Sequence, residues 1–237
     1  MRNKLFLMGI ILSFPICVGL LWVANIHCFW SDEVYKDRIW LHRTNTPEKL
    51  LEFANEYSGF ECDIIVRGDS LLDVTHDEPV TYGISADQYF RLLQSNNRRL
   101  WFDIKNLKQG NAPFVLSFFE SQCVAYQIDK KRLVIEGADP EALMLFRKAG
   151  FYTAFYVRLE ENPDLHAITE SGAVDALSFH ARDYDRIAKL QTAQIDWLVW
   201  ENHTKKEMLS VLPRGRQLLK DKRVKIILVK DKGHYHL

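Results

Sequence analysis

Eight short apolar segments recur along the chain after residue 38, and segments with helical character separate them. Most of these apolar segments are continuous rather than alternating, which is typical of parallel strands covered on both faces. The expected strands are residues 39–42, 60–66, 100–104, 133–136, 152–157, 176–179, 197–200 and 224–229. Eight strands that alternate with helices predict an α/β fold, a (β/α)8 TIM barrel, and a doubly wound open sheet is the alternative.

Capping residues mark the starts of several expected helices. Thr46-Pro47 and Asp139-Pro140 each place a capping side chain before a proline at the first helical position. Ser85 and Gln88 have the spacing of a capping box. Further helices are expected at residues 113–125, 184–191 and 205–219, and a small extra hairpin is expected through residues 67–70.

The first 30 residues differ from the rest of the chain. No charged residue occurs from residue 5 to residue 30. Roughly 20 apolar residues are enough to cross the hydrocarbon core of a bilayer, and this run is longer than the core of a cleaved signal. We therefore expect residues 1–30 to form one N-terminal transmembrane helix that anchors a domain spanning residues 31–237. A cleaved signal is the alternative.

The charges that flank this run predict how the chain is oriented in the membrane. Arg2 and Lys4 precede the run, whereas Asp32 and Glu33 follow it. Because basic residues stay on the cytoplasmic side of a membrane, the N-terminus is expected in the cytoplasm. The domain then lies on the non-cytoplasmic side of the membrane, and the chain crosses the membrane once.

The charge balance bears on the partners that the chain can have. The chain has 31 basic and 31 acidic side chains, so its formal net charge is zero. A nucleic-acid partner usually requires a basic face, and we expect none here. Cys62 and Cys123 are the two cysteines of the expected domain. Cys62 should point away from the carboxylate face and is expected to be a buried thiol, with a disulfide to Cys123 as the alternative.

Carboxylates occur inside two of the expected strands. Alternation along a strand places Glu61 and Asp63 on one face, and it places Asp103 and Lys105 on a shared face of another strand. Burying such carboxylates is costly unless a positive charge neutralises them. Mg²⁺ and Ca²⁺ prefer carboxylate oxygens, so the pattern favours a site for one divalent cation. Active sites of TIM barrels lie at the C-terminal ends of the strands, where these residues occur.

Four motifs in a fixed order carry a resemblance to a known family. The motifs are His42-Arg43, Glu61-Cys62-Asp63, His76-Asp77 and Asp103-Ile104-Lys105. Their order resembles the glycerophosphodiester phosphodiesterase family and its wider superfamily of phospholipase-like barrels. Asp103 replaces the glutamate that is usual in that family, and with Asn45 it resembles the sphingomyelinase D branch found in spider venoms. Trp200 resembles the tryptophan that lines the pocket in both branches.

The chain also departs from the family pattern. The Pro-Glu-Asn-Thr segment that follows the first histidine in the family is absent, and Glu201-Asn202 replaces the Thr-Val-Asn expected after Trp200. The match is dense from residue 42 to residue 106 and rests mainly on strand order beyond it. The resemblance therefore implies a reaction class but does not identify the substrate.

The resemblance implies a role for each matched residue. Three carboxylates would bind one divalent cation, Mg²⁺ or Ca²⁺, and two histidines would act as general acid and base. Lys105 would offset the charge of the phosphate, and three further residues would contact the substrate. The cation ligands are Glu61, Asp63 and Asp103, the acid–base pair is His42 and His76, and the substrate contacts are Arg43, Asn45 and Trp200. Glu136 and His180 also end expected strands and are further candidates for substrate contact.

The resemblance and the N-terminal segment together predict a membrane-anchored, metal-dependent phosphodiesterase. Its substrate would be a glycerophosphodiester or a phospholipid. The main alternative is a catalytically inactive barrel that binds a phosphorylated lipid or glycan in an envelope assembly. The divergent segment after His42 and the missing Thr-Val-Asn favour this alternative, whereas the intact histidine pair favours the enzyme.

Overall fold

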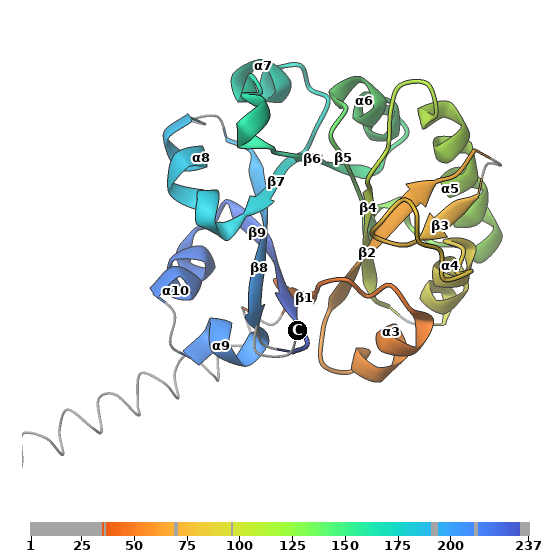
Figure 1. Ribbon diagram of the computed structural model, residues 1–237, viewed down its shortest axis with the longest axis horizontal. Helices are drawn as coiled ribbons and strands as arrows, with labels where there is room; N and C mark the ends of the chain where they lie inside the picture. Colours follow the sequence, from red (N-terminus) through yellow and green to blue (C-terminus); the bar gives the residue numbers. More distant parts are fainter. Residues whose placement is uncertain are drawn as a thin grey trace, which may run out of the picture.

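The computed structural model describes residues 35, 37–68, 71–95, 97–190, 194–210 and 213–232 (Figure 1). The transmembrane helix predicted for residues 1–30 lies outside the described residues. Within the described ranges, no helix is both long and apolar enough to cross a membrane.

Eight parallel strands form a closed ring, and the helices lie around the outside of this ring (Figure 1). The strands are β1 (Ile39–Leu41), β2 (Gly59–Val66), β4 (Arg99–Ile104), β5 (Leu133–Gly137), β6 (Tyr152–Tyr156), β7 (Ala176–His180), β8 (Asp196–Thr204) and β9 (Val224–Lys230). Strand β1 pairs with both β2 and β9, and these two pairings close the barrel. The structure confirms all eight predicted strands and the TIM barrel, and closure excludes the open sheet.

A ninth strand extends the sheet beside β2. Strand β3 (Leu72–Val74) runs antiparallel to β2, with Ile64 opposite Val74 and Val66 opposite Leu72. This pairing confirms the predicted hairpin. It also returns the chain to the C-terminal end of the barrel, where His76 lies two residues after the end of the strand.

The helices follow the strands in the expected order. They are α3 (Pro47–Phe53), α4 (Asp87–Gln94), α5 (Ala112–Tyr126), α6 (Pro140–Lys148), α7 (Leu165–Glu170), α8 (Tyr184–Leu190), α9 (Lys205–Ser210) and α10 (Pro213–Lys220). The Thr46 hydroxyl accepts the backbone N–H of Lys49 at 3.2 Å and caps α3. The Asp139 carboxylate caps α6 in the same way. Both predicted cap-and-proline starts are therefore confirmed.

Two details of the predicted helices are wrong. The capping box does not form, because α4 begins at Asp87 and the N–H of Gln88 donates to the backbone carbonyl of Ser85 rather than to its side chain. Ser85 instead forms a β-bridge with Asp73. The single helix expected at residues 205–219 is divided into α9 and α10. Pro213 cannot donate a helical backbone hydrogen bond, so it begins a new helix rather than continuing the first.

The strands divide the hydrophobic core into two parts. Their outward faces pack against the helices in a large cluster that includes both domain cysteines. Cys62 is a buried free thiol, as predicted; Cys123 is also a buried free thiol, and no disulfide joins them. Inward-facing residues fill the barrel below the site: Trp40, Trp101, Val134, Ala154, Ala176, Leu198, Ile226 and Leu228. These side chains fill the barrel interior and form the floor beneath the site.

Trp40 is the largest contribution of β1 to this floor, and it requires a glycine beside it. The Trp40 ring is fully buried. A Cβ atom at Gly59 would lie 2.2 Å from Cδ2 of that ring, so no other residue fits there without displacing it. The Arg99 guanidinium lies over the ring, 4.7 Å from its centroid. These contacts close the end of the barrel opposite the predicted site.

Candidate active site

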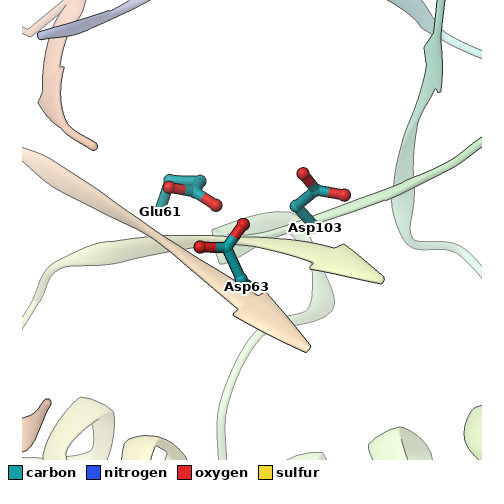
Figure 2. Close-up of side chains that lie close together, drawn as sticks. All are labelled: Glu61, Asp63 and Asp103. Atoms are coloured by element: carbon teal, nitrogen blue, oxygen red, sulfur yellow. The ribbon is translucent and has the colours of Figure 1, made fainter. Parts of the chain in front are cut away.

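Three carboxylates converge at the C-terminal ends of two neighbouring strands. Glu61 and Asp63 extend from β2, and Asp103 extends from β4, where it lies opposite Asp63 in the strand register. Figure 2 shows the three side chains turned toward one another. One ligand oxygen from each carboxylate lies within 4.8 Å of the others. The tertiary structure therefore brings the three predicted cation ligands to one point.

The partners of these carboxylates leave part of their negative charge unbalanced. Oε2 of Glu61 accepts the backbone N–H of Arg43 at 2.6 Å, whereas its Oε1 is buried and has no hydrogen-bond partner in the described structure. The Lys105 ammonium lies 2.7 Å from an Asp63 oxygen and also hydrogen-bonds to Asp103. One ammonium thus faces three carboxylates. The ammonium balances the charge of one carboxylate, and the two charges of a divalent cation would balance the remaining two. The residues therefore fit such a cation.

The environment shifts the pKa of each carboxylate differently. Burial, reinforced by the negative charge of Asp63, raises the pKa of Glu61 well above its ordinary value. Burial also raises the pKa of Asp103, although Lys105 opposes this shift. Burial acts on Asp63 in the same direction, but the Lys105 ammonium and the Asn45 amide outweigh it and hold the pKa of Asp63 below its ordinary value. The surroundings therefore stabilise the ionised form of Asp63 more than those of Glu61 and Asp103.

Asn45 contacts the carboxylate cluster directly. Its Nδ2 donates to Oδ2 of Asp63 at 2.7 Å, and its Oδ1 accepts the backbone N–H of Asp63 at 2.9 Å. This paired contact fixes the position of the Asp63 carboxylate. Asn45 is thus a positioning residue here, and its predicted contact with substrate stays a prediction.

His42 follows β1 directly and lies at the edge of the carboxylate cluster. Its Nε2 is 3.7 Å from Oε2 of Glu61, and its ring centroid is 5.9 Å from that of Trp200. Burial lowers the pKa of His42 to about 3. The imidazole is therefore neutral at neutral pH.

Arg43 connects the two histidines in an unusual backbone conformation. Its φ of 52° lies in the left-handed region, which costs energy for a residue with a side chain. Its N–H donates to Glu61, and its carbonyl accepts the Lys49 ammonium at 3.2 Å. These contacts hold the strained residue in place. They also direct its guanidinium to Nε2 of His76, at 2.9 Å.

The contacts of His76 determine which ring nitrogen faces which partner. Because the Arg43 guanidinium can only donate, Nε2 of His76 accepts this hydrogen bond. The other nitrogen, Nδ1, lies 2.7 Å from a carboxylate oxygen of Asp77. Asp77 therefore orients the ring.

These side chains line a pocket of about 90 Å³ above the barrel floor. Its lining residues are His42, Arg43, Glu61, His76, Trp101, Asp103, Lys105, Glu136, Tyr156, Trp200 and Leu228. Seven of the nine predicted site residues are among them, whereas Asp63 and Asn45 are not lining residues. Trp101 and Tyr156 were not predicted. Strand alternation was the available signal for such residues. Trp101 precedes Asp103 by two residues, so both side chains lie on the same face of the strand.

The candidates Glu136 and His180 lie in different places. Glu136 lines the pocket, next to Asp103 in the strand register. His180 is not a lining residue, and its ring centroid lies 4.2 Å from that of Trp200. His180 therefore supports the position of the tryptophan.

Several solved structures share this arrangement of strands and helices. The chain superposes on a glycerophosphodiester phosphodiesterase from Parabacteroides distasonis with a TM-score of 0.63 and 15% identity, covering 82% of this chain and 92% of that one. The fold is that of the glycerophosphodiester phosphodiesterases. An enzyme of the same name from Agrobacterium tumefaciens gives a TM-score of 0.57 and 13% identity, covering 81% of this chain and 95% of that one.

A further similar structure contains a reaction product. A phosphodiesterase from Oleispira antarctica, in complex with the product sn-glycerol-3-phosphate, gives a TM-score of 0.60 and 10% identity, covering 83% of this chain and 94% of that one. No family model and no curated protein matches the sequence. At these identities the likeness establishes the fold, which agrees with the resemblance carried by the four motifs. The features of the sphingomyelinase D branch stay a prediction.

Proposed function

We propose that the protein is a metal-dependent phosphodiesterase that acts on glycerophosphodiesters or on phospholipid-type substrates. One observation carries this proposal: Glu61, Asp103, two histidines and a lysine line one pocket at the C-terminal end of the barrel, and a carboxylate oxygen of Asp63 lies within 4.8 Å of those two carboxylates. The fold shared with glycerophosphodiester phosphodiesterases supports the same reaction class. Asn45, Arg43 and Asp77 hold the convergent groups in place.

Each side chain has a distinct task in the proposed reaction. A divalent cation held by Glu61, Asp63 and Asp103 would polarise the phosphoryl oxygens and neutralise developing charge. The neutral His42 ring takes the proton of the attacking hydroxyl as the new P–O bond forms. His76, held through Nδ1 by Asp77, would give the proton on Nε2 to the leaving oxygen as the old P–O bond breaks, once the Arg43 guanidinium turns from Nε2 to the phosphate. Lys105 and Arg43 lie within the pocket and offset the charge of the phosphate.

Turnover of a small panel of substrates tests the proposed function. The full-length protein in detergent is expected to cleave glycerophosphodiesters, lysophospholipids or bis(p-nitrophenyl) phosphate with Mg²⁺ or Ca²⁺, and to lose this activity with EDTA. Phosphorus NMR separates a phosphomonoester product, which water produces, from a cyclic phosphate, which a neighbouring hydroxyl of the substrate produces. Absence of turnover with metal still bound would instead support the inactive binding barrel.

We also propose that residues 1–30 anchor the protein in a membrane as a single-pass helix, with the domain on the non-cytoplasmic side. The uncharged run from residue 5 to residue 30 and the basic residues that precede it support this proposal. The full-length protein should stay in the membrane pellet after alkaline carbonate extraction. In intact spheroplasts, external protease should digest the domain. Release into the supernatant, or protection from the protease, would contradict the anchor or its orientation, respectively.

A further inference from the structure

The loop that carries His76 is exposed along most of its length. Residues 75–83, here called the His76 loop, leave β3 and lead toward α4. The backbone N–H of Thr75 donates to the carbonyl of Asp63 at 3.1 Å, which fixes the start of the loop. All residues from 77 to 83 are exposed. Because exposed side chains bury little apolar area, packing contributes little to the position of this loop, and its hydrogen bonds matter most.

Beyond the start of the loop, two arginines make the hydrogen bonds that join its described residues to the rest of the domain. Arg43 donates to Nε2 of His76 at 2.9 Å. The Arg67 guanidinium donates to the backbone carbonyl of Glu78 and, at 2.6 Å, to that of Val80. In the proposed reaction the Arg43 guanidinium turns to the phosphate. Arg67 is then the side chain that still holds the loop.

A buried carboxylate holds Arg67 in turn. Arg67 follows β2, and Asp73 lies in β3, where it is fully buried. Nε and Nη2 of Arg67 donate to Oδ2 of Asp73 at 3.0 and 2.8 Å. The planar guanidinium carries five donors and therefore binds this carboxylate and the two loop carbonyls at once. A lysine carries its donors on one nitrogen, which cannot span the three acceptors.

Stability alone does not explain this ion pair. Burying a carboxylate is costly, and replacing a buried ion pair by well-packed apolar side chains of similar volume is often neutral or stabilising. The Arg67–Asp73 pair gives the loop two hydrogen bonds that an apolar pair could not give. We propose that Arg67 is a positioning residue for His76, the general acid of the proposed reaction, and that it keeps the His76 loop in place when Arg43 turns to the phosphate. This inference rests on the proposed function.

The test uses two substrates that differ in their need for a proton on the leaving group. The alkoxide leaving group of glycerophosphocholine needs one, whereas the p-nitrophenolate released from bis(p-nitrophenyl) phosphate is a stable anion and does not. Misplacing His76 should therefore slow cleavage of the first substrate alone. In Arg67→Lys, kcat for glycerophosphocholine should fall about 100-fold, with KM changed less than about twofold. The value of kcat for the other substrate should fall less than about threefold.

A double variant separates the position of the loop from the stability of the fold. Arg67→Met alone would leave the buried charge of Asp73 without a partner and would strongly destabilise the fold. Arg67→Met combined with Asp73→Asn removes both charges, so it should fold and show the same kinetic pattern as Arg67→Lys. Thermal unfolding checks both variants. The matched control combines Arg147→Met with Asp175→Asn, a pair 2.9 Å apart at the opposite end of the barrel, and should leave both rates unchanged.

Three results would overturn the proposal. Equal losses of kcat on both substrates would indicate a general structural effect. Full activity of the double variant on glycerophosphocholine would show that the loop keeps its place without Arg67. Wild-type kcat in Arg67→Lys would show that a positive charge beside Asp73 is sufficient. If the double variant does not fold, Arg67→Lys, which keeps that charge, still decides.

Limited proteolysis keeps this test separate from the proposed function, because it needs no turnover. Tyr82, in the His76 loop, is 63% exposed and is a cleavage site for chymotrypsin, whose attack requires the loop to open. In the full-length protein both Arg67 variants should be cut after Tyr82 about tenfold faster than the wild type, with mass spectrometry identifying the site. Wild-type cleavage rates would overturn the positioning role even in an inactive protein. Absence of turnover by the wild type, with faster cleavage in the variants, would overturn only the proposed function.

Discussion

Replacing His42 by alanine is expected to lower kcat of the full-length protein about 100- to 10,000-fold on a phosphodiester substrate. The reason is the position of its neutral ring beside the carboxylate cluster, where it can accept the proton of the attacking group. The fold should survive, because Nδ1 of His42 is buried without a hydrogen-bond partner in the described structure. Steady-state kinetics with saturating metal, together with thermal unfolding, measures both effects.

His166→Ala is the matched control for this variant. His166 is an exposed histidine of α7 that lies 3.2 Å from Glu170, far along the chain from the site motifs. Its replacement should leave kcat unchanged. Wild-type turnover by His42→Ala would remove His42 from the mechanism. An equal loss in both variants would point to a general effect on the protein.

The stability of His42→Ala should also depend on pH differently from the stability of the wild type. The pKa of His42 is about 3 in the folded protein and near 6.5 when the chain is unfolded, so the unfolded chain binds a proton first. The neutral ring therefore favours the folded state fully above pH 6.5, and this contribution is lost as the pH falls toward 3. His42→Ala lacks this loss, so its stability relative to the wild type should increase on acidification.

Replacing Asp63 by asparagine is expected to weaken divalent-metal binding by at least about 100-fold and to abolish metal-dependent turnover. Asp63 is the ligand whose ionised form is best supported, since Lys105 and Asn45 both contact it. The amide has nearly the same shape but cannot carry the charge. Calorimetric titration with Mg²⁺ and Ca²⁺ measures the affinity, and the rise in melting temperature on adding metal gives an independent readout.

Glu78→Gln is the control, because Glu78 is exposed and lies outside the carboxylate cluster. It should bind metal as the wild type does. Acidification should also weaken metal binding to the wild type, since the raised pKa values of Glu61 and Asp103 make protons compete with the cation. Unchanged metal affinity in Asp63→Asn would show that the three carboxylates are not the metal site.

The strand pattern and the order of the motifs could be predicted from the sequence because both are local. Most of the buried strands contain a continuous apolar run, and alternation along β2 places Glu61 and Asp63 on one face whatever surrounds them. Helix starts were predictable where the capping side chain acts on its own helix, as at Thr46 and Asp139. The predicted capping box at Ser85 does not form, because the Ser85 backbone forms a β-bridge with Asp73, which belongs to another segment.

The contacts that join the motifs could not be predicted from the sequence. The left-handed backbone of Arg43 depends on a carboxylate 18 residues away, and the partner of its guanidinium lies 33 residues away. The tautomer of His76 depends on that guanidinium. Trp101 and Tyr156 resemble ordinary core aromatics in the sequence, and only closure of the barrel makes them pocket walls.

The sequence by itself determined the eight strands, the side of the barrel that carries the polar residues and the chemical types that gather there. These follow from apolar patterning and strand alternation, which act over a few residues. Only the tertiary structure decided which groups share the Lys105 ammonium, which pKa values rise or fall, and which oxygen of Glu61 accepts the backbone N–H of Arg43. These depend on distances and burial that exist only after β1 pairs with β9 and closes the barrel.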